Sequence, residues 1–216
     1  MQGGTERDAL AKCLWNILLC ECLYPSFQIL EVAFRNSVHF EIAQALKIPD
    51  WLMTDPGILY EDEISAIQKS KASATLKVNR RALTEDILIA EMKFGFWTSL
   101  LDSRYETLWH KIIAGVFPHM PKTIRTRREA SKLMNAVRRL RNASLHHHSI
   151  WHWHDLKDQH DQMRTLIEYI CRSSSAMAAQ LDRFPAVYSS GLLQSRNTAD
   201  NILLASATRL TGLPST

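Results

Sequence analysis

The spacing of apolar residues is the feature of this sequence that most constrains its fold. In several long segments, apolar residues recur three or four positions apart, as they do along one face of an α-helix. Only 7 of the 216 residues are glycine and 7 are proline, so the helical segments have few interruptions. No segment shows the alternation of apolar and polar residues that predicts a half-buried β-strand. The sequence therefore predicts an all-α fold, in the form of a helical bundle.

Prolines predict where the helices are interrupted. Pro25 is expected to end a helix over residues 8–23, because proline lacks the backbone donor of a helix interior. Ser26 is then expected to cap a second helix that continues to Leu46. After Pro185, the Ser-Ser-Gly segment is expected to form a loop.

The remaining helices are predicted from the same periodicity. Thr84 and Asp155 are predicted N-caps, since their side-chain oxygens can accept hydrogen bonds from the first turn of a helix. We predict a helical domain over residues 1–184, followed by a C-terminal loop and short helix over residues 185–216. The other predicted helices cover residues 62–74, 84–100, 104–116, 126–145, 155–181 and 201–210.

Composition and charge limit the class of protein. Hydrophobic residues make up 46% of the chain and charged residues 22%, as expected of a soluble globular protein. No run approaches the ~20 apolar residues of a membrane-spanning helix, and the N-terminus lacks the order of a signal peptide. The four cysteines form no CxxC pair and three of them lie among apolar residues, so we expect buried free thiols in a reduced, cytoplasmic protein.

Positive charge is concentrated between residues 122 and 141. This segment has eight basic residues and one acidic residue, Glu129, so its local charge is +7 while the whole chain carries +4. Such a helix is either a solvated surface or a track for phosphate groups. Trp151 and Trp153 come after it, and they could stack on unpaired bases or pack in the core. The basic residues are Lys122, Arg125, Arg127, Arg128, Lys132, Arg138, Arg139 and Arg141.

Six of the nine histidines lie between residues 146 and 160, and three interpretations of them are open. They could form a polar surface without a role. His148 and His152 could bind a metal together with His160 or Asp155, although no HExxH motif or cysteine accompanies them. They could also perform acid-base chemistry on RNA. Arg141 would then bind a phosphate, while a histidine moves a proton from the ribose 2′-OH to the leaving 5′-oxygen.

Three segments carry a resemblance to a known family. Residues 141–146, Arg-Asn-Ala-Ser-Leu-His, match the R-N-x-x-x-H form of the RX4–6H motif of HEPN domains. Residues 147–151 resemble the segment after that motif in Abi-like (abortive infection) proteins. LEVAFRNSVH at residues 30–39 and AEMKFGFWTSLL at residues 90–101 resemble two helices of the same family. The chain thus resembles an Abi-like protein with a HEPN domain over residues 10–182.

The resemblance implies a HEPN-type helical bundle that forms a homodimer and cleaves RNA without a metal or cofactor, as a toxin or phage-defence effector. It implies that Arg141 and His146 are catalytic, that Asn142 supports them, and that two such motifs meet across a two-fold interface. Besides RNA, an antitoxin or regulatory protein is a candidate partner, and no membrane is expected. We expect RNA to contact Lys132, Arg138, Arg139, His147 and His148. Ser149 and His152 depart from the basic or asparagine residues of Abi-like proteins.

Other interpretations stay open. The HEPN domain could be catalytically inactive and bind nucleic acid or regulate a partner, or the protein could be a metal sensor. Glu31 and Arg35, one helical turn apart, could pair with each other to fix their helix in the bundle, or contact the Arg141 site. The Phe-Gly-Phe-Trp segment is expected to pack in the core, with Gly95 allowing another helix to approach closely.

Overall fold

The structure, a computed structural model, describes residues 6–77 and 82–211, which form helices joined by loops, without a β-strand. The all-α fold predicted from the sequence is confirmed, whereas a HEPN-type arrangement of the helices stays a prediction. The helices are α1 (Glu6–Leu46), α2 (Trp51–Thr54), α3 (Glu61–Lys77), α4 (Glu85–Glu91), α5 (Phe94–Ser99), the 3-10 helix η1 (Ser103–Tyr105), α6 (Glu106–Val116), α7 (Arg127–Leu145), α8 (Leu156–Ile170), α9 (Arg172–Leu181) and α10 (Phe184–Thr211).

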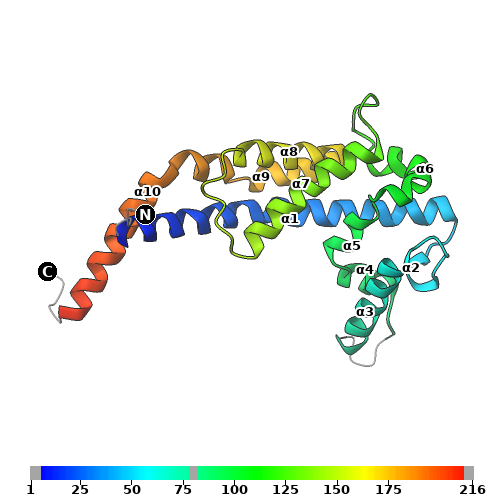
Figure 1. Cartoon of the computed structure of the whole chain (residues 1–216), viewed down its shortest axis with the longest axis horizontal. Helices are drawn as coiled ribbons and strands as arrows, with labels where there is room; N and C mark the ends of the chain where they lie inside the picture. Colours follow the sequence, from blue (N-terminus) through cyan, green and yellow to red (C-terminus); the bar gives the residue numbers. More distant parts are fainter. Residues whose placement is uncertain (1–5, 78–81, 212–216) are drawn as a thin grey trace.

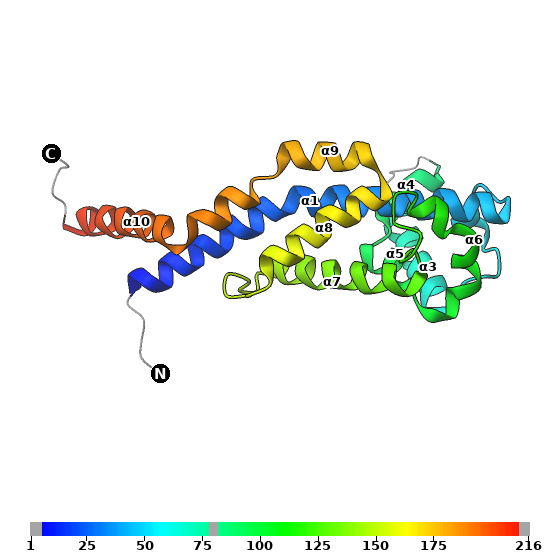
Figure 2. The same cartoon turned by 90° about the horizontal axis from the view of Figure 1, so that it is seen from above.

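Helix α1 runs along the bundle, and the other helices are arranged around it (Figure 1). Helices α7, α8 and α9 lie along its middle, while α2 to α6 gather around its C-terminal end. Helix α10 packs against the N-terminal part of α1. Residues 6–24 of α1 pair with α10, and the outer parts of both helices extend from the bundle as a two-helix arm in which α10 continues beyond the start of α1 (Figure 2). We call these two segments the arm.

Pro25 does not interrupt α1, so the predicted helix break and the cap at Ser26 are wrong. A proline inside a helix costs about 3 kcal/mol, because one hydrogen bond is lost and the ring meets the preceding turn. The helix continues because both of its flanks are buried: Leu23 is 1% exposed, and Phe27 is 4% exposed. Each buried side chain of this size contributes ~1.5–3 kcal/mol, so packing on both sides of Pro25 offsets its cost.

Two segments predicted as single helices are each divided. Residues 84–100 form α4 and α5, with an extended backbone at Met92. Met92 and Phe94 are both buried, although residues two apart on one helix point about 200° away from each other. The break therefore lets both side chains reach the core. Residues 155–181 form α8 and α9, separated by Cys171, whose φ of −155° is extended.

The predicted caps have different outcomes. Thr84 caps α4 as expected, because its hydroxyl oxygen accepts a hydrogen bond from the Ile87 N–H at 3.4 Å. Asp155 precedes α8 but makes no side-chain capping hydrogen bond, so that prediction is wrong.

The loop expected after Pro185 is also absent, since α10 covers this part of the chain with a kink at Gly191 (φ 60°, ψ −162°). Pro185 is tolerated because it lies in the first helical turn, where backbone N–H groups have no intrahelical partner. Ion pairs tie α10 to α1 along the arm, including Arg196 Nε to Asp8 Oδ1 at 3.0 Å. The C-terminal segment is therefore a long helix rather than a loop followed by a short helix.

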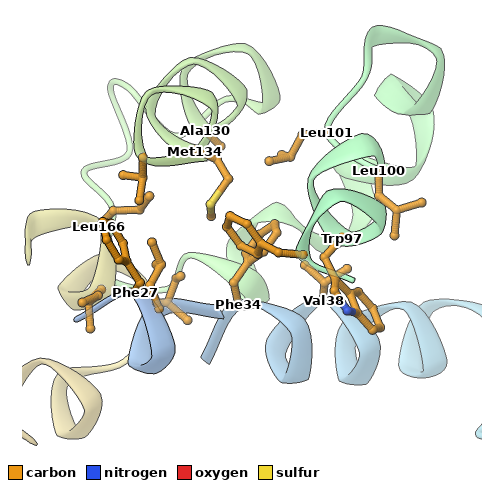
Figure 3. Packing of buried hydrophobic residues seen from close by; sticks show 14 of the residues in the cluster. Phe27, Phe34, Val38, Trp97, Leu100, Leu101, Ala130, Met134 and Leu166 are labelled. Atoms are coloured by element: carbon orange, nitrogen blue, oxygen red, sulfur yellow. The ribbon is translucent and has the colours of Figure 1, made fainter. Parts of the chain in front are cut away.

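The core lies where α1 meets α5, α7 and α8. Figure 3 shows Phe34 and Val38 of α1 facing side chains from these helices, among them Trp97 and Met134. The Phe-Gly-Phe-Trp segment packs in this core as predicted, since Trp97 is fully buried. Gly95 is exposed, and no atom lies within 4 Å of a Cβ added there, so the predicted close helix approach at this glycine is wrong.

The expectation of buried free thiols is met only in part. All four cysteines are free thiols, but Cys22 is buried while Cys13 is exposed, so burial is not general.

Helix α1 contains an 18-residue window with a mean hydropathy of 1.5, of which 44% is buried. By length and composition alone this helix is apolar enough to cross a membrane, contrary to the expectation that no segment is. The core helix of a soluble protein meets the same criterion.

A buried carboxylate attaches α3 to the rest of the bundle. The side chain of Glu63 is 1% exposed and accepts three hydrogen bonds, from Arg104 Nη2 at 2.7 Å, Ser99 Oγ at 2.8 Å and the Tyr105 hydroxyl at 2.6 Å. Burial, followed by the hydrogen bond to Glu63, raises the pKa of Tyr105, so its phenol remains a donor at neutral pH. The carboxylate is therefore held by donors from three positions of the neighbouring segment.

We predict that Glu63→Ala lowers the free energy of unfolding by about 1–3 kcal/mol, because the Tyr105 and Ser99 hydroxyls lose their acceptor, while Arg104 is 29% exposed and keeps Asp62 at 3.9 Å. Urea unfolding followed by circular dichroism measures this change. The matched control is Glu61→Ala on the same helix, which removes an exposed carboxylate and should change stability by less than about 0.5 kcal/mol. Equal effects of the two variants would contradict the role given to Glu63.

Candidate active site

Helix α7 decides which basic side chains are available to a ligand. Thr126 caps the helix by accepting a hydrogen bond from the Glu129 N–H at 3.2 Å, and the predicted helix over residues 126–145 is confirmed. One face of α7 is anchored in the core, so the rotation of the helix about its axis is set by packing. The buried residues are Ala130, Met134, Val137, Leu140, Ala143 and Ser144.

This orientation gives the basic residues of α7 different surroundings. Arg127 is held by the carboxylate of Glu106 and by the Leu101 carbonyl oxygen, so it has a structural role. Six further positions lie on the side of α7 that faces away from the core. At about 100° per residue, they fall within about 40° of a line parallel to the helix axis, and this row is about 27 Å long. None of the six is acidic. We call them the polar row: Arg128, Lys132, Asn135, Arg139, Asn142 and His146.

Arg141 lies outside the polar row, on the side of α7 that faces α1. Its Nη2 atom is 3.1 Å from Glu31 Oε2, and its guanidinium lies 5.6 Å from the ring centre of Phe94. The side chain is 27% exposed, so a ligand can still reach it. A carboxylate and an aromatic face together hold the guanidinium in one place.

Glu31 therefore contacts the Arg141 site, which is one of the two roles that the sequence left open for it. The alternative, an ion pair between Glu31 and Arg35, is not formed within 4 Å among the described residues. The Nε atom of Arg35 is instead buried without a hydrogen-bond partner.

Helix α7 ends in a turn formed by His146, His147 and His148. These are the first residues of the segment 146–151, which we call the histidine segment. The His146 N–H donates to the Asn142 carbonyl at 2.9 Å, and the His148 N–H donates to the Ala143 carbonyl at 2.9 Å. His147 lies between them with a φ of 61°, a left-handed conformation that glycine or asparagine usually provides at a helix end. The backbone of the histidine segment thus continues directly from the hydrogen bonding of α7, and all three side chains are exposed.

The two candidate catalytic side chains do not point in the same direction within one chain. They are five residues apart on one helix, which places them about 140° apart around its axis. Arg141 faces α1, whereas His146 is exposed at the end of the polar row, next to Asn142. A single copy therefore presents a guanidinium and an imidazole on different sides of α7.

Asn16 on α1 holds the histidine segment from the other side, a role that the sequence analysis missed. Its Oδ1 atom accepts hydrogen bonds from the backbone N–H groups of Ile150 at 2.7 Å and Trp151 at 3.3 Å. Its Nδ2 group donates to the His148 carbonyl at 3.3 Å. No local pattern could have revealed this contact, because Asn16 and Ile150 are 134 positions apart in the chain.

The two tryptophans after the histidines are half-buried and packed against the core. The ring centre of Trp151 is 6.5 Å from that of Trp15, and Lys12 Nζ lies 5.3 Å from it. Packing, rather than base stacking, is therefore the role that the geometry favours for Trp151.

The metal interpretation is not supported by the arrangement of the histidines. His160 is buried, stacked on Phe184, and held by Asp161 and Asp182 at 3.1 Å on either ring nitrogen. His148 and His152 are exposed. Among the residues that the structure describes, no group of three or more histidine, cysteine, aspartate or glutamate side chains could hold a metal ion.

Comparisons of the chain with protein-family models, with curated proteins and with solved structures return no match. The resemblance to Abi-like HEPN proteins therefore stands on the three sequence segments alone.

We predict that Asn16→Ala loosens the histidine segment, because the Ile150 and Trp151 N–H groups and the His148 carbonyl lose their partner. Hydrogen exchange measured by mass spectrometry should become faster over residues 148–151. The free energy of unfolding should fall by about 1–3 kcal/mol. Asn36→Ala, at an exposed position on the same helix, is the control and should leave exchange in this segment unchanged. Unaltered exchange in Asn16→Ala would show that the three hydrogen bonds do not hold the segment.

Proposed function

We propose that this protein is a metal-independent endoribonuclease of the HEPN type that works as a homodimer, with a role as a toxin or phage-defence effector. One observation carries the proposal. An arginine fixed by Glu31 and Phe94 and an exposed histidine occur at the end of one helix, in the spacing of the RX4–6H motif. The polar row, which has no acidic member, leads up to that point and suits a polyanion.

The proposed reaction uses the ribose 2′-OH of RNA as its nucleophile. The imidazole of His146 accepts the proton of this hydroxyl, and the oxygen attacks the adjacent phosphorus. Arg141 donates hydrogen bonds to the phosphate oxygens, where negative charge increases. The bond from phosphorus to the 5′-oxygen breaks, and the proton is returned to that oxygen. The products are a 2′,3′-cyclic phosphate and a 5′-hydroxyl, and DNA is not a substrate because it lacks the 2′-OH.

The orientation of the two side chains accounts for the homodimer in this proposal. In an ideal helix Arg141 and His146 lie about 140° apart, so a site shared between two copies removes the need for one copy to direct both at the same phosphate. Two copies related by a two-fold axis can place the arginine of one beside the histidine of the other. Asn142, exposed next to His146, would then orient the imidazole or bind a phosphate oxygen.

We predict that the protein cleaves single-stranded RNA in the presence of EDTA, and that Arg141→Ala and His146→Ala each lower the rate by at least ~100-fold. Gel analysis of an end-labelled RNA, with mass spectrometry of the termini, measures the rate and detects the cyclic phosphate. Arg172→Ala and His110→Ala are matched controls, because both residues are exposed on other helices. His147→Ala and His148→Ala test which of the three histidines acts as the base.

Equal cleavage by the wild type and by both site variants would refute the enzyme. Loss of activity in His148→Ala alone would keep the reaction and replace His146 as the base. Salt-dependent RNA binding without any product would support the second candidate, an inactive HEPN domain that binds nucleic acid. The polar row supports that second function equally well.

We predict that Lys132→Ala combined with Arg139→Ala weakens RNA binding and makes it less dependent on salt. Each lost phosphate contact removes about 0.7 from the slope of log K against log salt concentration for a single strand, so the double variant should change the slope by about 1.4. Fluorescence anisotropy with an RNA oligonucleotide at several salt concentrations measures it. The control, Lys69→Ala combined with Lys111→Ala, removes the same charge from other helices, and an equal slope change in the control would refute the polar row as the binding surface.

A further inference from the structure

The arm exposes apolar side chains that the rest of the chain does not cover. On α1, Ile17 is 56% exposed, Tyr24 is 51% exposed and Leu18 is 40% exposed. Burying such side chains is the main favourable term in folding and association, so a continuous exposed set on one helix is a candidate interface. We call these three residues, together with the exposed Cys13 and the half-buried Leu10 and Leu14 on the same face, the arm stripe: Leu10, Cys13, Leu14, Ile17, Leu18 and Tyr24.

Three acidic groups of the arm are already paired within the chain. Glu21 pairs with Arg183 at 2.8 Å and Asp8 pairs with Arg196 at 3.0 Å, and Arg7 pairs with Asp200. Residues 13–20 contain no charged side chain at all. A partner that docks on the arm stripe therefore meets mainly apolar side chains, and the charge of Glu21 beside them is already compensated by Arg183.

We propose that a second copy of this chain docks on the arm stripe. The stripe is self-complementary about Ile17, since Leu10 and Tyr24 lie seven residues before and after it. When two copies of α1 cross antiparallel at Ile17, the leucine of each copy meets the tyrosine of the other. Glu21 then faces Cys13 rather than another glutamate, because these two residues lie four positions on either side of Ile17. A two-fold interface requires this match of a surface with itself.

The arm is also large enough for a stable contact. At about 1.5 Å per residue and about 10 Å width, residues 6–24 have an outline of roughly 290 Å² and α10 one of roughly 420 Å², so a contact of standard size must cover both helices. A standard interface buries ~800 Å² on each partner. The end of α10 that projects beyond α1 adds Ile202 and Leu204, which are 40% and 67% exposed (Figure 2).

This docking would bring the histidine segments of both copies to one interface. The same turn of α1 carries Ile17 on its exposed side and, at Asn16, the hydrogen bonds that hold the histidine segment. A second copy on the arm stripe thus carries its own histidine segment to the edge of the contact. This consequence for catalysis rests on the proposed ribonuclease function, whereas the docking itself does not.

The test is the oligomeric state of the full chain. Light scattering and sedimentation should give the wild type twice the 24.8 kDa of one chain at micromolar concentration. Ile17→Asp should raise the dissociation constant of the dimer roughly 100-fold or more, since it replaces two apolar contacts with charges at the two-fold axis. Phe40→Asp is the matched control, because Phe40 lies on the same helix, is 57% exposed and is outside the arm, and it should leave the dimer intact. Circular dichroism confirms that both variants are folded.

A cross-link provides a second measurement that does not depend on disrupting the surface. Mild oxidation of Ile17→Cys, in a background with Cys13→Ser, should join two chains through a disulfide at the crossing point. Phe40→Cys in the same background should stay unlinked.

Three results would overturn the proposal: a monomeric wild type, a dimer unaffected by Ile17→Asp, or a monomer that floats with phosphatidylcholine–phosphatidylglycerol vesicles. The last would make the stripe a lipid-binding surface. An intact dimer of Ile17→Asp together with RNA cleavage that needs His146 would refute the docking surface and keep the enzyme. A monomeric Ile17→Asp in a protein that never cleaves RNA would refute the enzyme and keep the docking surface.

Discussion

The unbroken course of α1 through Pro25 is the constraint on which the rest of the structure depends. Helix α1 packs against α5 to α10, so each of these helices takes its place from the same continuous surface. Its fully buried residues include Leu19, Leu30, Phe34 and Val38. A break at Pro25 would separate the arm from the bundle, because Leu19 lies before the proline and the other three residues lie after it. The cost of an internal proline is small beside the burial of both flanks.

The candidate site is held from two points on this one helix. Glu31 positions the guanidinium of Arg141, and Asn16 holds the backbone of the segment after His146. About four turns of α1 separate these two points, so a single rigid element supports both ends of the site. The position of α1 therefore sets both the Arg141 guanidinium and the backbone of the segment that follows His146.

Tertiary packing also divides the +7 segment into residues with different roles. Arg127 and Arg141 are turned toward carboxylates of α6 and α1, whereas Arg128, Lys132 and Arg139 stay exposed on the polar row. Because these two guanidinium groups are held by carboxylates of neighbouring helices, they are less available to a ligand than the exposed side chains of the polar row. The surface available to a polyanion is therefore narrower than the basic composition of the segment implies.

The sequence by itself determined the helical character of the chain, the bounds of α7 and the cap at Thr84, because periodicity and capping depend on residues a few positions apart. It also predicted the Arg141 motif and the concentration of basic residues. Only the tertiary structure decided that α1 passes through Pro25, that Glu31 contacts Arg141 rather than Arg35, and that Asn16 holds the histidine segment. These outcomes depend on which helix faces meet, and contacts between residues 110 and 134 positions apart leave no mark in a local pattern.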